Sequence, residues 1–190
     1  KFRITERALV RYQVMTWMDQ FLSWEYRLCY HETNMNNQKI SVVTGANGFV
    51  GSHLVDLLLE KGNEVRCITR KTSNLRWLEN KNVKIYDCGL FNKEGLMKAL
   101  DGADYLYHVA GVVKAKKPEG YFKGNVETTK NLFEALSELN SKIERVVIVS
   151  SQTASGPSLN DQVVNEESEP HPITNYGRSK LEQEKLALSY

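Results

Sequence analysis

The stretch Val42-Val43-Thr44-Gly45-Ala46-Asn47-Gly48-Phe49-Val50-Gly51 decides the fold of this chain. An apolar run over 40–43 predicts a buried strand. A helical pattern begins soon after Gly45 and would place Val50, Leu54, Leu57 and Leu58 on one face. Three glycines with the spacing GxxGxxG therefore lie at a strand-to-helix turn. Gly45 permits a tight turn, Gly48 leaves room for a ligand beside the main chain, and Gly51 lets the helix pack close to the strand.

A helix that begins at such a turn offers free N–H groups and a partial positive charge to a phosphate. The glycine spacing is one residue wider than the usual GxGxxG, but the preceding strand and the following helix are the context of a dinucleotide-binding turn. An ordinary turn is the alternative interpretation. The predicted ligand contacts of the turn are Gly45, Asn47, Gly48, Phe49, Val50 and Gly51.

Strand and helix patterns alternate along the rest of the chain. Apolar runs predict strands over 40–44, 64–69, 83–86, 105–109 and 145–149. Helices are predicted over 49–61 (ended by Gly62), 93–101, 121–139 and from about 175. In the helix over 121–139, the expected buried side carries Phe122, Val126, Phe133 and Leu136. Apolar strands alternating with helices predict an α/β fold with a Rossmann-type, doubly wound parallel sheet covered on both faces.

Composition excludes several classes of protein. The chain has 190 residues, of which 41% are hydrophobic, and a formal net charge of +2, so nucleic acid is not an expected partner. The sequence contains no run of about 18 apolar residues, so no membrane-spanning helix is predicted. Cys29, Cys67 and Cys88 lack metal-ligand spacing, so no metal site is predicted, and packed reduced thiols indicate a cytoplasmic protein.

Residues 1–34 are predicted to lie outside the fold that residues 35–190 form. Apolar residues recur there every three or four positions, which fits an amphipathic helix for a partner or a membrane surface. The favoured interpretation is a leader or a misassigned start. Met35 and four polar residues after it lead directly into the first strand, as an ordinary protein start would.

The end of the second strand predicts which dinucleotide binds. NAD sites usually place a carboxylate there for the ribose 2′-hydroxyl, whereas this chain has Arg70 and Lys71. A guanidinium binds a 2′-phosphate bidentately, and Lys71, Ser73 and Asn74 add donors. NADP(H) is therefore favoured over NAD(H). The alternative is that the two cations are simply solvated.

Two segments near the end of the chain carry candidate catalytic residues. Ser151 follows the fifth strand, and Tyr176 and Lys180 form a YxxxK pattern that puts both on one helix face. A free tyrosine has a pKa of about 10, and a nearby ammonium lowers it. Ser151 would donate a hydrogen bond to a substrate oxygen, and Lys180 would also hold a nicotinamide ribose.

Together these segments resemble the extended branch of the short-chain dehydrogenase/reductase superfamily, the NAD-dependent epimerase/dehydratase family. The resemblance covers 39–190 and rests on TGANGFVG at 44–51, Asp87, HVAG at 108–111, Asn125, SSQTASG at 150–156 and YGRSK at 176–180. It implies a catalytic set of Ser151, Tyr176 and Lys180. It also implies an adenine contact at Asp87 and further cofactor contacts at Cys88 and Ala110. Members continue past this helix into a substrate domain, so the chain is expected to be an N-terminal fragment, truncated before that domain.

The reaction predicted is hydride transfer between a nicotinamide and a small-molecule carbonyl or alcohol. Gln152 and Thr153 stand where dehydratases carry Asp-Glu, and an amide cannot replace a carboxylic acid in proton transfer. The segments at 70–74 and 150–154 look more like the dihydroflavonol-reductase-like group. A sugar-nucleotide epimerase and a non-catalytic dinucleotide-binding protein remain alternatives, and a homodimer is left open.

Three further sites have structural interpretations beside functional ones. Asn125 is either a satisfied interior amide or, as the resemblance implies, a support for the active-site backbone. His108 is expected to be structural, because no second metal ligand lies near it in the sequence. Lys114, Lys116 and Lys117 are expected to form a solvated rim, with an anionic substrate as the alternative.

Overall fold

Strands and helices alternate through the part of the chain that the computed structural model describes, residues 38–159, 163–165 and 167–190. Lys39–Tyr190 form one compact unit. The predicted extension over 1–34 lies outside the described residues. The elements are β1 (Ile40–Thr44), α2 (Phe49–Glu60), β2 (Glu64–Ile68), β3 (Val83–Tyr86), α3 (Lys93–Leu100), β4 (Tyr105–His108), α4 (Pro118–Phe122), the π-helical turn η1 (Lys123–Glu127), α5 (Thr128–Glu138), β5 (Arg145–Ile148), the 3₁₀ turn η2 (Gln152–Ala154) and α6 (Asn175–Leu188).

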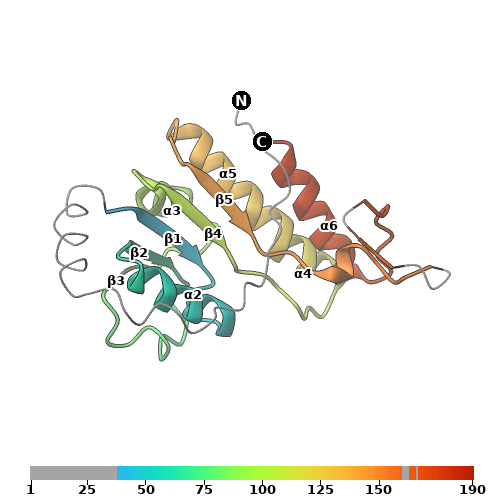
Figure 1. Ribbon diagram of the computed structural model, residues 1–190, viewed down its shortest axis with the longest axis horizontal. Coiled ribbons are helices and arrows are strands. Elements are labelled where there is room, and N and C mark those ends of the chain that lie inside the picture. The colour runs from blue at the N-terminus through green and yellow to red at the C-terminus, as the bar shows by residue number, and fades with distance from the viewer. Residues whose placement is uncertain (1–37, 160–162, 166) are drawn as a thin grey trace, which may run out of the picture. The chain divides into compact units, whose positions relative to one another are not determined.

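The five strands form a wholly parallel sheet in the order β3-β2-β1-β4-β5 (Figure 1). The chain runs outward from β1 to β3 and then returns to β4 on the other side of β1. Thr44 pairs with both Ile68 of β2 and His108 of β4, so these three strands end level with one another. The loops after β1 and β4 therefore meet where the strand order reverses, which is where doubly wound sheets bind ligands. The predicted fold class is confirmed.

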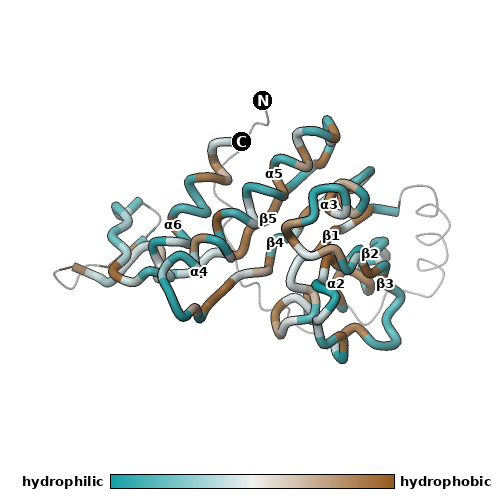
Figure 2. Tube along the Cα trace, turned by 180° about the vertical axis from the view of Figure 1, so that it is seen from behind, coloured by the Kyte–Doolittle hydropathy of each residue, from teal (hydrophilic) through white to brown (hydrophobic). Residues whose placement is uncertain are grey.

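Two hydrophobic cores cover the two faces of the sheet, because successive side chains of a strand point to opposite faces. Val42 lies in the core that includes residues of α3 and α5, whereas Val43 lies in the core that includes residues of α2. Ile68 and Cys67 of β2 divide between the cores in the same way. Hydrophobic segments accordingly run along the central strands in Figure 2. Burial on both faces explains why β1 is a continuous apolar run.

Helix α2 packs on the sheet through a face that coincides only in part with the one that its apolar residues predict. Leu54 and Leu58 lie in or against the core, as predicted. Val50 and Leu57 are 57% and 47% exposed, whereas Gly51, Val55 and Leu58 are buried. Gly51 sets the rotation of the helix, since a Cβ there would stand 2.1 Å from a carbonyl oxygen of the glycine turn. Once position 51 faces the sheet, positions 55 and 58 follow it by helical spacing.

The predicted helix over 121–139 begins earlier than expected and contains a π-helical turn. α4, η1 and α5 run without a break from Pro118 to Glu138. Among the four residues expected on the buried side, Leu136 is buried, and Phe122, Val126 and Phe133 are only half buried. A π turn holds one extra residue, so the buried positions after it follow those before it at a spacing one residue longer than in a regular helix. The residues that this stretch buries are Asn125, Thr128, Thr129, Leu132, Ala135 and Leu136.

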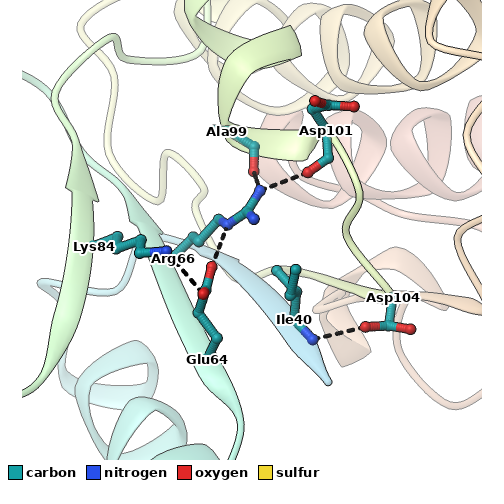
Figure 3. Close-up of polar contacts among 7 residues, drawn as sticks. All are labelled: Ile40, Glu64, Arg66, Lys84, Ala99, Asp101 and Asp104. Carbon is teal, nitrogen blue, oxygen red and sulfur yellow. Dashed lines mark hydrogen bonds and ion pairs between the residues drawn. The ribbon is translucent and has the colours of Figure 1, made fainter. Parts of the chain in front are cut away.

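At the amino-terminal edge of the sheet, Arg66 ties β2 to the end of α3 (Figure 3). Its Nη1 donates to the carbonyl oxygens of Ala99 (3.1 Å) and Asp101 (2.6 Å), and its Nε donates to Glu64 (2.8 Å). The last carbonyl groups of a helix have no partner within the helix. One guanidinium therefore satisfies two carbonyl groups there and fixes α3 against β2.

Asp104, directly before β4, links β4 to β1 at the same edge (Figure 3). Its carboxylate accepts a hydrogen bond from the Ile40 N–H at 2.7 Å and pairs with Lys39 Nζ at 3.0 Å. Lys39 also pairs with Glu144, which precedes β5. Hydrogen bonds from Lys39 and Tyr105 hold the pKa of Glu144 below its usual value. Together these contacts align the starts of three strands.

The described thiols and the lysines near the loop after β4 have the burial that the sequence predicts. Cys67 is buried and Cys88 is half buried, both as free thiols, and burial raises the pKa of Cys67 to about 12. Cys29 lies outside the described residues. Lys114, Lys116 and Lys117 are all exposed. Within the described ranges, none of the helices has the length and apolar character needed to cross a bilayer.

Candidate dinucleotide and catalytic site

The three glycines after β1 are required for different reasons. Gly45 has φ +69°, and a Cβ there would stand 2.8 Å from the Ala110 nitrogen at the end of β4. A Cβ at Gly51 would overlap the Gly45 carbonyl group. Gly48 is exposed, and the only nearby atom that a Cβ there would meet is the Gly45 oxygen at 3.3 Å. The fold itself therefore demands Gly45 and Gly51, whereas Gly48 keeps open a space on the solvent side of the turn.

The first turn of α2 faces that space with unused backbone donors. Gly48 is the N-cap residue and supplies no side-chain hydrogen bond, and the first turn carries no acidic residue. Phe49 and Val50 are exposed at 76% and 57%. Free N–H groups without a competing carboxylate suit a pyrophosphate. The residues present therefore fit a dinucleotide at this turn.

The loop after β2 lies beside both the glycine turn and the end of β3. Asn47 Nδ2 donates to the Asn74 carbonyl oxygen at 3.4 Å. Arg70 forms a β-bridge with Cys88, and its N–H donates to Ser73 Oγ at 3.2 Å. Both Arg70 and Lys71 are exposed, as is Asp87, which directly precedes Cys88. The structure thus places the residues predicted for the adenosine half of a dinucleotide in one neighbourhood.

Asn125 holds the loop after β4 against α6. Its Oδ1 accepts from the Val112 N–H at 2.7 Å, and its Nδ2 donates to the Val112 carbonyl oxygen at 3.2 Å and to Ser179 Oγ at 2.9 Å. The side chain is completely buried. The amide is therefore satisfied in the interior, and the same contacts support the backbone of the loop after β4. The π-helical turn presents this amide.

Helix α6 begins against the segment that carries Ser151. Thr174 is its N-cap residue, with Oγ1 accepting from the Gly177 N–H at 2.9 Å. A Cβ at Gly177 would stand 2.2 Å from the Thr153 carbonyl oxygen, so only glycine lets α6 approach η2 this closely. Ser151 Oγ lies 2.9 Å from Thr153 Oγ1. The N-terminal turn of α6, which contains Tyr176, is thereby fixed beside the end of β5.

Tyr176 and Lys180 lie one helical turn apart on α6. The ring of Tyr176 is 6.2 Å from that of Tyr121 on α4, between centroids. Lys180 is 3% exposed, and its Nζ donates to the Val149 carbonyl oxygen at 2.8 Å. Val149 lies two residues before Ser151. The Lys180 ammonium is therefore anchored at the carboxyl end of β5, beside the segment of the predicted catalytic serine.

Two buried groups near this anchor have altered acidity. Burial lowers the pKa of Lys180 to about 8, and the Glu184 carboxylate opposes that shift. Burial, together with the charge of Lys180, lowers the pKa of His108 to about 3. His108 is hydrogen bonded to Thr44 Oγ1 and Thr129 Oγ1 at 2.7 and 2.9 Å. His108 is thus a neutral structural residue at neutral pH, as the sequence predicts.

Several polar residues of this region are absent from the sequence-based prediction. Gln183 and Thr129 are completely buried and hydrogen bonded to each other at 2.7 Å, and Ser150 Oγ bonds to Glu184. A signal for them exists in the sequence. Ser179, Lys180 and Gln183 recur at helical spacing on α6, which therefore turns a polar rather than apolar face toward η1 and α5.

A parallel sheet with a glycine-lined turn at its switch point and a YxxxK helix beside it defines a dinucleotide-binding α/β protein of the Rossmann type. The model of the NAD-dependent epimerase/dehydratase family matches residues 41–190, and the chain belongs to that family.

Three similar proteins illustrate the range of this family. Cinnamoyl-CoA reductase 1 of Petunia hybrida is 38% identical over 120 residues, which are 60% of this chain and 35% of that protein. UDP-glucose 4-epimerase of Streptococcus mutans is 32% identical over 154 residues, 76% of this chain and 45% of the epimerase. The structure of UDP-glucuronic acid 4-epimerase from Bacillus cereus in complex with NAD aligns with a TM-score of 0.70 and 30% identity, covering 80% of this chain and 52% of that one.

The chain spans about half, or less, of the length of these relatives. The similarity to both a reductase and epimerases agrees with the predicted family.

Proposed function

We propose that the chain carries the dinucleotide-binding and catalytic part of an NADP(H)-dependent oxidoreductase. It reduces an aldehyde or ketone group on a small apolar molecule, or oxidises the corresponding alcohol. The observation that supports this most is the anchored ammonium of Lys180, which lies beside the Ser151 segment and one helical turn from Tyr176. Burial of a charged group costs free energy, so buried cations are usually paired or have a functional role. The buried position of the Lys180 ammonium therefore favours a catalytic role.

When bound, a nicotinamide exchanges a hydride with the substrate carbon. Tyr176 would donate a proton to the carbonyl oxygen during reduction, and Ser151 would hold that oxygen by a hydrogen bond. A positive charge one helical turn away stabilises the tyrosinate that is left. With a pKa of about 8, Lys180 is mostly charged at pH 7 and supplies that stabilisation.

The preference for NADP(H) rests on charge at the end of β2. Arg70 and Lys71 are exposed there, and no carboxylate occupies the position that would bind a ribose 2′-hydroxyl. The N–H of Arg70 is tied to Ser73, which shapes the loop and leaves the guanidinium to extend from it. A guanidinium binds a phosphate bidentately, so it favours the phosphorylated dinucleotide.

The test is turnover with a panel of aromatic and aliphatic aldehydes and ketones, followed by nicotinamide absorbance. Tyr176→Phe should abolish turnover and leave the dissociation constant for NADPH nearly unchanged. Tyr121→Phe is a matched control, because it removes a phenolic hydroxyl group from the ring next to that of Tyr176. Turnover retained by Tyr176→Phe would refute the assigned role.

A sugar-nucleotide epimerase is the second candidate, favoured by the similarity to UDP-glucose 4-epimerase over 76% of this chain. Such a reaction oxidises and then re-reduces the same substrate. It would interconvert two sugar nucleotides with no net change in nicotinamide absorbance, and this distinguishes it from the reductase.

A further inference from the structure

Gln183 lies on the buried face of α6, one turn beyond Lys180, and is 0% exposed. Its Nε2 donates to Thr129 Oγ1 at 2.7 Å, and its Oε1 accepts a hydrogen bond from Lys180 Nζ. A buried glutamine with both ends engaged has one fixed orientation.

The proton of Thr129 determines that orientation. A hydroxyl group has one proton, and Thr129 Oγ1 donates it to the Asn125 carbonyl oxygen at 2.7 Å. Thr129 must therefore accept from its other two neighbours, the Gln183 amide and His108 Nε2. Because Gln183 presents its NH₂ group to Thr129, its carbonyl oxygen faces Lys180.

The hydrogen-bond roles of His108 and of Thr44 on β1 are fixed in turn. His108 donates from Nε2, and as a neutral ring it accepts at Nδ1, so Thr44 Oγ1 donates to it at 2.7 Å. Thr44 Oγ1 in turn accepts from the Ala110 N–H at 3.1 Å. A continuous series of hydrogen bonds thus joins Thr44, His108, Thr129, Gln183 and Lys180. We refer to it as the Thr44–Lys180 series.

We propose that Gln183 is a positioning residue for Lys180. The Gln183 carbonyl oxygen and the Val149 carbonyl oxygen hold two of the three ammonium protons, so the third is directed by the protein rather than by thermal rotation. The series behind Gln183 prevents its amide from turning over. This inference rests on the proposed function only in that Lys180 serves Tyr176.

Lys180 Nζ also lies near Gly111, because a Cβ at Gly111 would stand 3.9 Å from it. Gly111 follows β4 at the switch point. The ammonium therefore lies between the ends of β4 and β5. The charged or titratable groups around it are Glu184 and Tyr176 on its own helix and neutral His108 on β4.

The experiment compares Gln183→Glu and Gln183→Met by the ¹³C chemical shift of the Lys180 ε-carbon as pH is varied. The chain is labelled with [¹³C]lysine, and the resonance is assigned by its absence in Lys180→Arg. Gln183→Glu places a carboxylate against the ammonium and should raise the pKa of Lys180 by about one unit or more. Gln183→Met removes the acceptor and should lower that pKa by about one unit.

Glu182→Gln is the matched control, because Glu182 is the exposed neighbour of Gln183 on α6 and its change should leave Lys180 unaffected. Opposite shifts in the two Gln183 variants support the proposal, and a Lys180 titration that neither variant alters overturns it. Gln183→Glu keeps the size of the side chain, so the comparison remains decisive if Gln183→Met fails to fold.

The NMR titration needs neither substrate nor turnover, so it separates this inference from the proposed function. If the titration shifts as expected and no carbonyl compound is reduced, the proposed function fails and the positioning role stands. If turnover is found, the pH above which kcat declines should move in the same direction as the pKa of Lys180 in each variant. An unmoved pH profile would contradict the positioning role.

Discussion

The side-chain nitrogen of Asn125 and the hydroxyl oxygen of Ser179 lie 2.9 Å apart, although the residues are separated by 54 positions in the chain. The contact joins the π-helical turn to α6. Because the same amide also binds both backbone groups of Val112, one side chain holds together a helix turn, a loop and α6.

Replacement of Asn125 by Leu should therefore destabilise the fold strongly. The Val112 N–H and carbonyl groups would lose their partner in a half-buried position, and the completely buried amide of Asn125 would be replaced by an apolar group, which together cost about 2–4 kcal/mol in the free energy of unfolding. Urea denaturation measures this. Asn82→Leu, at an exposed position, should change the free energy by no more than about 0.5 kcal/mol. Equal effects of the two changes would show that Asn125 has no special role.

Alanine at Gly51 and at Gly48 should have different consequences. Gly51→Ala forces α2 away from the Gly45 carbonyl group, and overpacking of this kind costs about 1–3 kcal/mol of stability. Gly48→Ala meets little of the protein and should preserve stability while weakening dinucleotide binding, because its methyl group enters the ligand space. Thermal unfolding and NADPH titration measure the two effects. A stable Gly51→Ala variant would contradict the packing argument.

Arg70→Ala should weaken NADPH binding by about tenfold to a hundredfold, because a charge-assisted pair with the 2′-phosphate contributes about 1.5–3 kcal/mol. NADH binding should change little. The control is Arg76→Ala, since the Arg76 guanidinium lies 4.7 Å from the Trp77 ring centroid on an exposed segment. Fluorescence titration with both dinucleotides gives the two dissociation constants. A parallel loss for NADH and NADPH would remove the argument for NADP(H).

The stability of the fold should depend on His108 at acidic pH. Its pKa is lowered to about 3 in the fold by burial and by the charge of Lys180, from 6.5 for a free side chain. Between these values the unfolded chain binds a proton that the folded chain does not, so stability falls as pH falls through this window. At pH 5 the loss is about 2 kcal/mol relative to pH 8.

His108→Gln should remove this part of the pH dependence, seen as a smaller slope of unfolding free energy against pH between 4 and 6. His53→Gln is the control, because His53 is exposed on α2 and its change should leave the slope as it is. An unchanged slope in His108→Gln would show that His108 is already charged in the fold.

The sequence predicts the strands and the glycine turn well because these depend on local patterns. Strand β1 has the predicted limits. An apolar run that follows polar residues and ends before a glycine indicates a buried strand with clear ends. Helix faces are predicted less well. The exposure of Val50 and Leu57 results from the approach of Gly51 to the turn, which hydrophobicity does not encode.

In the candidate site, too, residues in local motifs are predicted from the sequence, whereas residues that matter through tertiary contacts are not. Ser151, Tyr176 and Lys180 are predicted by motif, because their spacing is fixed within short segments. Gln183 and Thr129 are not found, since their significance lies in contacts between α6 and α5 across 54 positions. A buried polar residue is recognised as part of a network only when its partner is known.

The π-helical turn at Lys123–Glu127 has a consequence for how the gene tolerates change. Deleting one residue there would replace the wide turn with a regular helical turn and change the directions in which the side chains of this segment point. Asn125 would then turn away from Ser179 while Thr129 stayed beside Gln183. A systematic survey of single-codon deletions should find this short segment intolerant of shortening even at its exposed lysine, where ordinary substitutions are accepted.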